Sequence, residues 1–291
     1  MRGFIAYGLR IRSDIGVPGG LDAPRAVEAA DIAIELVPPR AGPADPALRR
    51  EGEEICFDAP GIAAYRCRAE RIRVAPCPGA DAADVEAVLV ATALPVSLWM
   101  RGGFVLHAAA ARLAGQESAI AIAGASGSGK STILAQLIDA GGSVLADDTV
   151  LLAAGDEAVQ GSGLAGGYFR ARSERAVRQF HPVPRERALE CAPVAAILVL
   201  SRGDSGTLTR LTPVEAVAHL LANRHRPHAP ALLGRHAATL ADSTLIAGST
   251  PIYAWRRPAG TLELAAWEWD ALARCAAGKG TGYDGQALAA Q

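Results

Sequence analysis

A glycine-rich stretch contains the residues best suited to bind phosphate: Gly124, Ala125, Ser126, Gly127, Ser128, Gly129, Lys130, Ser131 and Thr132. Its first eight residues match the pattern G-x-x-x-x-G-K-[ST] at every position. In such a loop the backbone N–H groups converge on phosphate oxygens, the lysine reaches the β- and γ-phosphates, and the hydroxyl ligates Mg²⁺. The pattern predicts a nucleotide site in which Lys130 holds phosphate and Ser131 holds the metal.

The residues on either side of this loop support that interpretation. Residues 119–123 form a short apolar run that predicts a buried strand, and residues 131–140 place their apolar side chains on one helical stripe. Gly141 then favours the end of the helix. Strand, glycine loop and helix is the context that distinguishes a phosphate-binding loop (P-loop) from a flexible turn.

The use of lysine in this chain points the same way. The sequence has 29 Lys and Arg residues, of which only Lys130 and Lys279 are Lys. A planar guanidinium does not replace a compact ammonium inside a phosphate cradle. Retention of Lys at the motif position is therefore what a phosphate-binding loop requires.

Two adjacent carboxylates, Asp147 and Asp148, follow a predicted strand soon after the loop. A carboxylate at the end of a strand that lies beside the loop strand is typical of a Mg²⁺ site, so we expect these two strands to be neighbours. Because adjacent side chains on a strand point to opposite faces, we expect the two to have different roles. One would hold the metal, directly or through water, and the other would meet an acceptor hydroxyl.

Three further residues are candidates with open alternatives. His107 lies on the predicted strand next to the loop, where it is either functional or a hydrogen-bonded core histidine. Arg170 and Arg172 follow a glycine-rich run and either contact a phosphate or an anionic peptide end, or are solvated surface residues. The six histidines are unevenly spaced, and this predicts no metal set among them.

Composition and charge exclude several classes of protein. A net charge of −1 argues against a general nucleic-acid binder. We see no apolar run near the length of a bilayer span and no signal peptide, so we expect neither membrane association nor secretion. The five cysteines are odd in number and lack C-x-x-C spacing, which indicates neither zinc nor disulfides and favours the cytoplasm.

The chain divides into three parts by pattern. Residues 1–80 predict a small β-rich domain of about five short strands, the first over residues 4–12. Residues 81–277 predict an α/β domain that begins with a linking helix over 81–101, capped by Asp81 or Asp84 and kinked at Pro95. Residues 278–291 are rich in Gly and Ala and predict a disordered tail.

Several elements are expected in the α/β domain. Residues 103–112 predict a strand that turns directly into the strand feeding the loop, and so short a connection forces an antiparallel hairpin and a mixed sheet. A capping box at Thr212–Glu215 begins a helix. The other elements expected are a charged flap or helix at 173–187, a strand at 195–200, a helix from Pro230 to Gly248, a strand at 251–255 and a helix at 262–272.

These residues resemble the core of the HPr serine kinase/phosphorylase family, which itself is similar to the ATP-dependent phosphoenolpyruvate carboxykinase core. The resemblance rests on His107, the hairpin, the loop Gly124–Ser131, the short helix, and Leu145-Ala146-Asp147-Asp148. It covers roughly residues 103–152. Tyr7–Asp14, Arg101–Ala108 and Arg210–Ala216 further resemble the HPr-kinase-like proteins of lasso-peptide clusters.

The resemblance implies roles for individual residues. Backbone amides of the loop with Lys130 would hold the phosphates of ATP, and Ser131 with Asp148 would bind Mg²⁺. Asp147 would accept the proton of the attacking hydroxyl, and His107 would lie close to the transferred phosphoryl group. The signature of the reverse phosphorylase activity is not visible, and residues 164–172 contain no carboxylate where the family has one.

We therefore expect an ATP- and Mg²⁺-dependent serine kinase acting on a peptide or protein, with the C-terminal serine of a ribosomally made precursor as the acceptor. The alternatives are a kinase of a carrier protein or a small hydroxylated metabolite, and an ATP-binding regulator that transfers no phosphate. The resemblance also implies a homo-oligomer, although no pattern in the sequence specifies a subunit interface.

Overall fold

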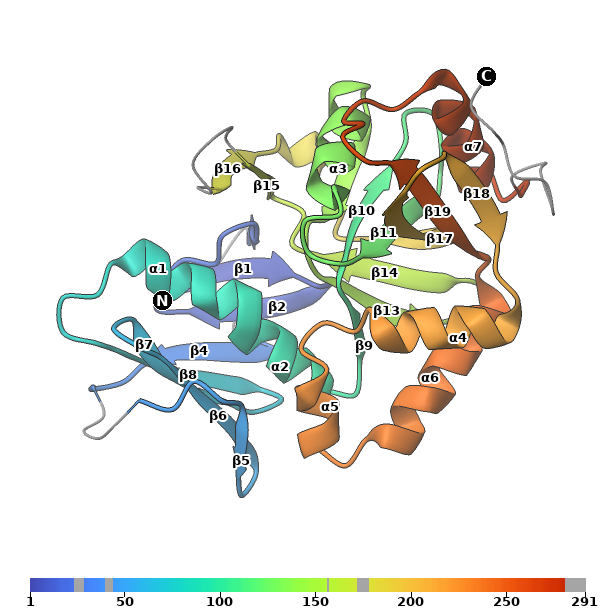
Figure 1. The fold of residues 1–291 in the computed structure, drawn as a ribbon. Helices are drawn as coiled ribbons and strands as arrows, with labels where there is room; N and C mark the ends of the chain where they lie inside the picture. Colours follow the sequence, from blue (N-terminus) through green and yellow to red (C-terminus); the bar gives the residue numbers. More distant parts are fainter. Residues whose placement is uncertain (24–28, 40–43, 156, 172–177, 281–291) are drawn as a thin grey trace.

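The computed structural model describes residues 1–23, 29–39, 44–155, 157–171 and 178–280. It shows a mixed α/β fold in which two sheets are joined by one long helical segment (Figure 1). The N-terminal sheet holds residues 2–76, and the C-terminal sheet holds residues 104–258.

The N-terminal sheet has eight strands in the order β3-β1-β2-β4-β8-β7-β6-β5. Strand β4 lies parallel to both of its neighbours, and the other pairs are antiparallel. The sheet is therefore richer in strands than the five expected. The strands are β1 (Arg2–Ala6), β2 (Leu9–Ser13), β3 (Leu21–Asp22), β4 (Ile32–Leu36), β5 (Arg49–Glu51), β6 (Glu54–Ala59), β7 (Ala63–Cys67) and β8 (Arg71–Pro76).

The single strand predicted over residues 4–12 is wrong, because β1 and β2 form a hairpin. Tyr7 and Gly8 make the turn with φ angles of 56° and 68°. Positive φ at both central residues suits the right-handed twist of the flanking strands. The alternation of apolar and polar residues continues across this two-residue turn and so hides it.

The linking helix begins as predicted at Asp81, whose Oδ1 accepts from the N–H of Ala83 at 2.9 Å. It continues through α1 (Ala82–Val88), a π-helical turn (Leu89–Ala93) and α2 (Leu94–Met100). Pro95 has no N–H to donate to the carbonyl of Ala91, four residues earlier. The π turn ends two residues before Pro95, close to the position predicted for the kink.

The same segment, Ala82–Met100, has 19 residues and a mean hydropathy of 1.5 in its most apolar window. By length and composition it could cross a membrane, so the expectation that no stretch approaches this length is wrong. In the structure 56% of that window is buried inside the molecule, including Leu89, Leu94 and Trp99.

The C-terminal sheet has the strand order β12-β10-β11-β17-β14-β13-β9, with β19 paired to both β17 and β18. The predicted antiparallel hairpin of β10 and β11 is confirmed, and β17 runs parallel to β11 and β19, so the sheet is mixed. The strands are β9 (Phe104–Leu106), β10 (Ala108–Arg112), β11 (Ala119–Gly124), β12 (Ser143–Ala146), β13 (Val150–Ala154), β14 (Val159–Gly163), β17 (Cys191–Gly203), β18 (Thr207–Arg210) and β19 (Ile252–Pro258).

Two details of this sheet differ from expectation. The strand predicted over residues 103–112 is broken at His107, so that β9 pairs with β13 while β10 pairs with β11 and β12. Strand β12, which precedes the two aspartates, is separated from the loop strand β11 by β10. Because of the break at His107, the first half of this segment pairs with β13 and the second half pairs with β11 and β12.

The helices cover both faces of this sheet. The capping box at Thr212 and Glu215 is confirmed at the start of α4. The helix predicted from Pro230 to Gly248 is two helices, because Gly234 interrupts it with a φ of 68°. The last helix begins four residues later than predicted. Beyond the linking segment, the helices are α3 (Lys130–Asp139), α4 (Pro213–Ala222), α5 (His228–Leu232), α6 (His236–Ser249), α7 (Ala266–Ala276) and a 3-10 turn (Arg185–Arg187).

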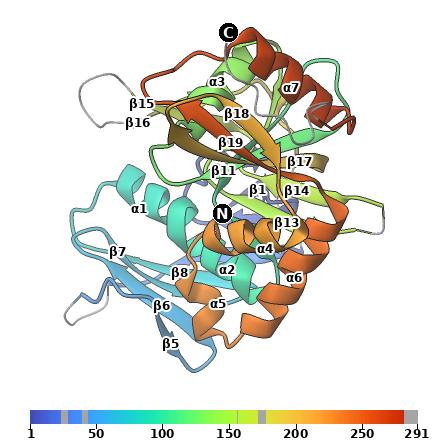
Figure 2. The same cartoon turned by 45° about the vertical axis from the view of Figure 1, so that its right-hand side comes forward.

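The charged region after residue 164 contains a two-stranded antiparallel ribbon rather than a helix, formed by β15 (Gly167–Ala171) and β16 (Arg178–Pro182). Arg172 and most of the predicted disordered tail lie outside the described residues. Figure 2 shows α4, α5 and α6 grouped together, with α5 beside the N-terminal sheet. Arg50 of β5 donates to the carbonyl of Leu232 in α5 at 3.3 Å.

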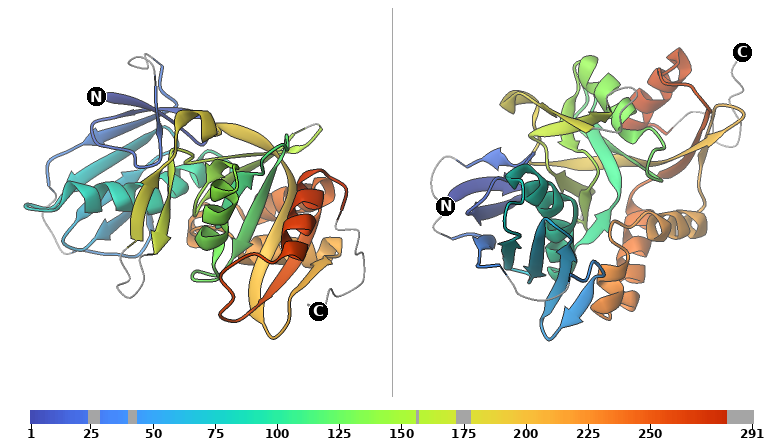
Figure 3. Two further views of the ribbon diagram at one scale, coloured as in Figure 1. Left: turned by 90° about the horizontal axis from the view of Figure 1, so that it is seen from above. Right: turned by 60° about the vertical axis from the view of Figure 1, so that its left-hand side comes forward.

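Strand β11 separates two hydrophobic cores because its side chains alternate between faces. Ile120 and Ile122 pack with α3 and α7, which lie on the same side of the sheet (Figure 3). Ala121 and Ala123 belong to a second core that continues through the linking helix into the N-terminal sheet. The two sheets thus share one core, and the division of the chain at residue 80 stays a prediction.

A buried ion pair fixes α7 to β19 and gives a first test of the fold. Glu268 accepts from Arg257 Nε at 2.7 Å, and both side chains are at most 3% exposed. We expect Glu268→Gln to lower the free energy of unfolding by about 3–5 kcal/mol, since it leaves a buried cation unpaired. Chemical denaturation measures this change.

The exposed pair of Arg2 and Asp22, 3.6 Å apart, is the matched control. Asp22→Asn should change stability by less than about 0.5 kcal/mol, because exposed pairs contribute little. Equal effects of the two substitutions would contradict the role given to Glu268.

Candidate functional site

The glycine loop, residues 124–131, has a backbone that only glycine accommodates at its two ends. Gly124 has a φ of 148°, and a Cβ placed there would lie 2.5 Å from the carbonyl oxygen of Leu200 on β17. Gly129 caps α3 with a φ of 108°. No side chain caps α3, so its first N–H groups face the loop without a side-chain acceptor.

Two observations show that the loop suits an anion. The N–H groups at the start of α3 combine with the positive end of the helix dipole. The hydroxyl of Ser128 is buried and lacks a hydrogen-bond partner among the described residues. Ala125, Ser126 and Gly127 are exposed at the tip of the loop, and Thr132 is exposed on α3.

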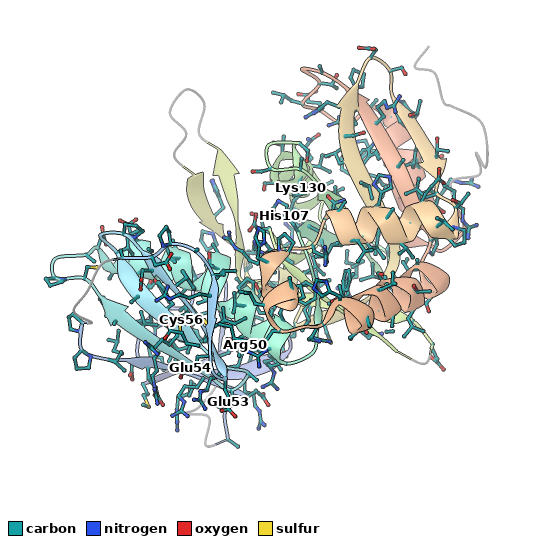
Figure 4. The ribbon with its side chains drawn as sticks, turned by 60° about the horizontal axis from the view of Figure 1, so that its bottom comes forward. Arg50, Glu53, Glu54, Cys56, His107 and Lys130 are labelled. Atoms are coloured by element: carbon teal, nitrogen blue, oxygen red, sulfur yellow. The ribbon has the colours of Figure 1, made fainter. Side chains whose placement is uncertain are left out.

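Lys130 is buried beneath the loop. Its ammonium donates to the carbonyls of Gly124 and Ala125 at 2.8 and 3.0 Å, and it lies 3.0 Å from His107 Nε2. Figure 4 shows His107 and Lys130 side by side. His107 Nδ1 lies 2.9 Å from the carbonyl oxygen of Asp148, which can only accept, so Nδ1 carries the proton and Nε2 accepts from Lys130.

The two aspartates face different partners. Asp147 is buried, and its Oδ1 accepts a hydrogen bond from Ser131 Oγ at 2.9 Å. Asp148 has a left-handed backbone with a φ of 79°. Its carboxylate oxygens lie 3.5 Å from His107 Nδ1 and 3.9 Å from His225 Nε2. The two carboxylates therefore have different partners, and the expectation that they have different roles stays a prediction.

His225 lies in the site although its position in the sequence gave no signal. Its N–H donates to the carbonyl of Val105 at 2.9 Å, which holds its segment alongside β9. Its Nδ1 lies 2.5 Å from Thr149 Oγ1, and its carbonyl accepts from Trp99 Nε1 at 2.7 Å. Burial lowers the pKa of His225 to about 4, against the opposing charge of Asp148.

The prediction that the six histidines form no metal set stays a prediction, although two of them lie close to Asp148. His107, Asp148 and His225 each offer one ligand atom, and these atoms lie within 4.8 Å of one another. Imidazole and carboxylate donors of this kind suit transition metals. Ser131 and Asp147 instead offer hard oxygen donors of the kind that Mg²⁺ prefers.

The N-terminal sheet also contributes to the site, through Tyr7 in the first hairpin. The N–H of Tyr7 donates to the carbonyl of Gly163 on β14 at 2.9 Å. Its hydroxyl is buried beside Asp148 and Thr149, and burial first, then the charge of Asp148, raises the pKa of Tyr7. The hairpin turn thus contacts β14, which pairs with β13 just after the two aspartates in the chain.

A cavity of about 1310 Å³ opens between the two sheets. Its lining includes the glycine loop at residues 124–126, His107, Asp148 and residues 222–228. The N-terminal sheet supplies residues 46–48 and 57–60, and the linking helix supplies Val88, Ala91 and Thr92. Asp148 therefore faces a large cavity with a partly apolar wall, whereas Asp147 does not line it.

The structure does not test the two arginines predicted as substrate contacts. Arg170 lies on β15, where only the backbone is described, and Arg172 lies outside the described residues. Arg224 and Arg226, which the sequence did not single out, line the cavity.

No protein-family model and no curated protein matches the chain. Among solved structures it is similar to the Hpr(Ser) kinase/phosphatase from Coxiella burnetii, at 20% identity and a TM-score of 0.28. The match covers 34% of this chain and 59% of that one. So loose a likeness establishes neither family nor function, and the chemistry has to be inferred from the site itself.

The buried state of His225 predicts how stability depends on pH. Its pKa is about 4 in the folded protein and near 6.5 when exposed, so between these values the unfolded chain binds more protons. Stability supplied by neutral His225 is fully present above pH 6.5 and is lost as the pH falls toward 4. From pH 7 to pH 5 this loss is about 2 kcal/mol.

His225→Asn removes this titration. We expect the variant to lose about 2 kcal/mol less stability than the wild type between pH 7 and pH 5, as measured by urea denaturation at the two pH values. Identical losses in the two proteins would mean that His225 is protonated in the folded state.

Proposed function

We propose that this protein is an ATP- and Mg²⁺-dependent kinase that phosphorylates a hydroxyl of a peptide or protein. The acceptor proposed is the C-terminal serine of a ribosomally made precursor peptide. The observation that carries the proposal is the division of the two aspartates, one bonded to Ser131 beneath the glycine loop and the other facing the cavity beside His107.

The loop would hold the phosphates of ATP. The N–H groups at the start of α3 and the ammonium of Lys130 provide the positive charge, and Lys130 would exchange its contacts with loop carbonyls for phosphate oxygens. Ser131 and Asp147 would hold Mg²⁺, which supplies charge neutralisation on the phosphates.

This assignment exchanges the roles that the family resemblance implied for the two aspartates. We favour Asp147 as the metal ligand because its Oδ1 bonds to Ser131 Oγ, the other proposed ligand. We favour Asp148 as the proton acceptor because it lines the cavity through which an acceptor would enter.

In the transfer step the acceptor oxygen would form a bond to the γ-phosphorus while the bond from that phosphorus to the β–γ bridging oxygen breaks. The hydroxyl proton would pass to the Asp148 carboxylate, and ADP would leave with the negative charge of the broken bond. A serine hydroxyl is a weak acid, so Asp148 has to orient it and take its proton late in a loose transition state. His107, held by Asp148 and Lys130, would position both groups.

Lys130 and Lys279 provide a matched test of the loop. Lys130→Ala should weaken ATP binding by at least about 10-fold, because it removes a charge-assisted contact to phosphate. Lys279→Ala removes an exposed lysine and should leave the affinity unchanged. Calorimetric titration with ATP and Mg²⁺ measures both, and unaltered binding by Lys130→Ala would refute the loop assignment.

The two aspartates are separated by a second pair of variants. Asp148→Asn should bind ATP normally but transfer phosphate from labelled ATP roughly 10²- to 10⁴-fold more slowly. Asp147→Asn should raise the Mg²⁺ concentration needed for half-maximal transfer.

The opposite pattern would restore the roles implied by the family resemblance. If both variants transfer phosphate at the wild-type rate, neither carboxylate takes part in catalysis, and only the assignment of ATP binding to the loop would stand. Normal ATP binding by the wild type with no transfer to any acceptor would indicate a regulator.

A further inference from the structure

Arg224 and Arg226 lie on a segment that the fold holds firmly against the site. The carbonyl of Asn223 accepts from the N–H of His107 at 2.8 Å, and His225 pairs with Val105 of β9. Arg226 has a left-handed backbone with a φ of 52°. Backbone strain of this kind persists where the surroundings enforce it, and it is concentrated at functional sites.

The proline in the linking helix explains how Arg226 is placed. Pro95 leaves the carbonyl of Ala91 without its helical donor, and Arg226 donates to that carbonyl from Nε at 3.0 Å and from Nη2 at 2.7 Å. Arg224 donates from Nε to the carbonyl of Leu221 at 2.7 Å. Each guanidinium thus uses part of its donor set on a backbone carbonyl, which orients it.

Neither guanidinium has a carboxylate partner within the described parts of the chain. On the N-terminal sheet, by contrast, Arg49, Arg66 and Arg68 all form ion pairs with nearby acids. Burial lowers the pKa of both Arg224 and Arg226. Two partly buried guanidinium groups that form no ion pair among the described residues, with Asp148 acting on Arg226 only at longer range, favour the binding of an anion in the cavity.

The surroundings of these arginines fit an acceptor better than a nucleotide. The negative charge of Asp148 acts on Arg226, so the cation lies within electrostatic reach of the proposed proton acceptor. The glycine loop already has its own cation and N–H donors for phosphate. The rest of the lining includes apolar side chains such as Leu48, Phe57 and Val88, which suit the side chains of a peptide.

We propose that Arg224 and Arg226 bind the free α-carboxylate of the C-terminal serine that is the proposed acceptor. This inference rests on the kinase function proposed above. In a C-terminal serine only Cα and Cβ separate the carboxylate carbon from the hydroxyl oxygen. One residue can therefore place its hydroxyl at Asp148 and its carboxylate at the two arginines.

The test uses two pools of synthetic peptides that end in serine after randomised residues, one pool with a free carboxylate and one with a C-terminal amide. We expect the wild type to phosphorylate the acid pool with a kcat/KM at least roughly 10-fold higher than the amide pool. Arg224→Gln should lower transfer to the acid pool by roughly 10- to 100-fold and change transfer to the amide pool less than about 2-fold. An unchanged rate of transfer to the amide pool then shows that the Arg224→Gln variant is folded.

Arg50→Gln is the charge-matched control, because Arg50 is exposed on β5 and does not itself line the cavity, although it donates to the carbonyl of Leu232 at the cavity wall (Figure 4). It should leave the ratio of acid to amide transfer unchanged. Arg224→Lys keeps the charge but loses the guanidinium fork and should restore part of the preference.

Three results would overturn the inference. Equal transfer to both pools by the wild type would show that the enzyme does not recognise the carboxylate, and the proposed kinase function would still stand. If Arg224→Gln binds ATP more weakly but still prefers the acid pool to the amide pool, Arg224 binds the nucleotide and not the acceptor. Normal ATP binding with no transfer to either pool would refute the proposed kinase function and this inference together.

Discussion

Two neighbouring carboxylates can serve different partners only if the backbone between them allows it. The left-handed conformation of Asp148 provides this separation, directly after strand β12 ends. Such a conformation costs a non-glycine residue on the order of 1 kcal/mol. The carbonyl of Asp148 compensates by accepting from the N–H of Ala108 and from His107. The break between β9 and β10 and the turn at Asp148 therefore support each other.

From this turn the site extends in two directions. Toward the helix α3, Asp147 and Ser131 form a small buried pair beneath the glycine loop. Toward the N-terminal sheet, Asp148 and His107 face a cavity whose walls come from both sheets and from the linking helix. A nucleotide and an acceptor would thus approach from two sides of the same backbone turn. The N-terminal sheet supplies part of the cavity wall.

The sequence predicted what is encoded locally. The glycine loop, the hairpin before it, the capping box at Thr212 and the adjacent aspartates all depend on residues close together in the chain. The sequence missed Tyr7, His225 and the two cavity arginines, because irregular segments bring them from distant parts of the chain. His225 is held by pairing between a loop and β9, and no periodicity marks such a segment. The different partners of the two aspartates also depend on the φ angle of Asp148, which an Asp-Asp pair in the sequence does not reveal.

The docking of Tyr7 onto Gly163 has a consequence for how the molecule forms. The first hairpin of the chain completes its contacts only after β14, more than 150 residues later, is available. A contact of such long sequence separation closes a large loop and is slow to form. During synthesis the N-terminal hairpin emerges early but waits for the second sheet before it can dock. The contact that joins the first hairpin to the second sheet is therefore formed late in folding.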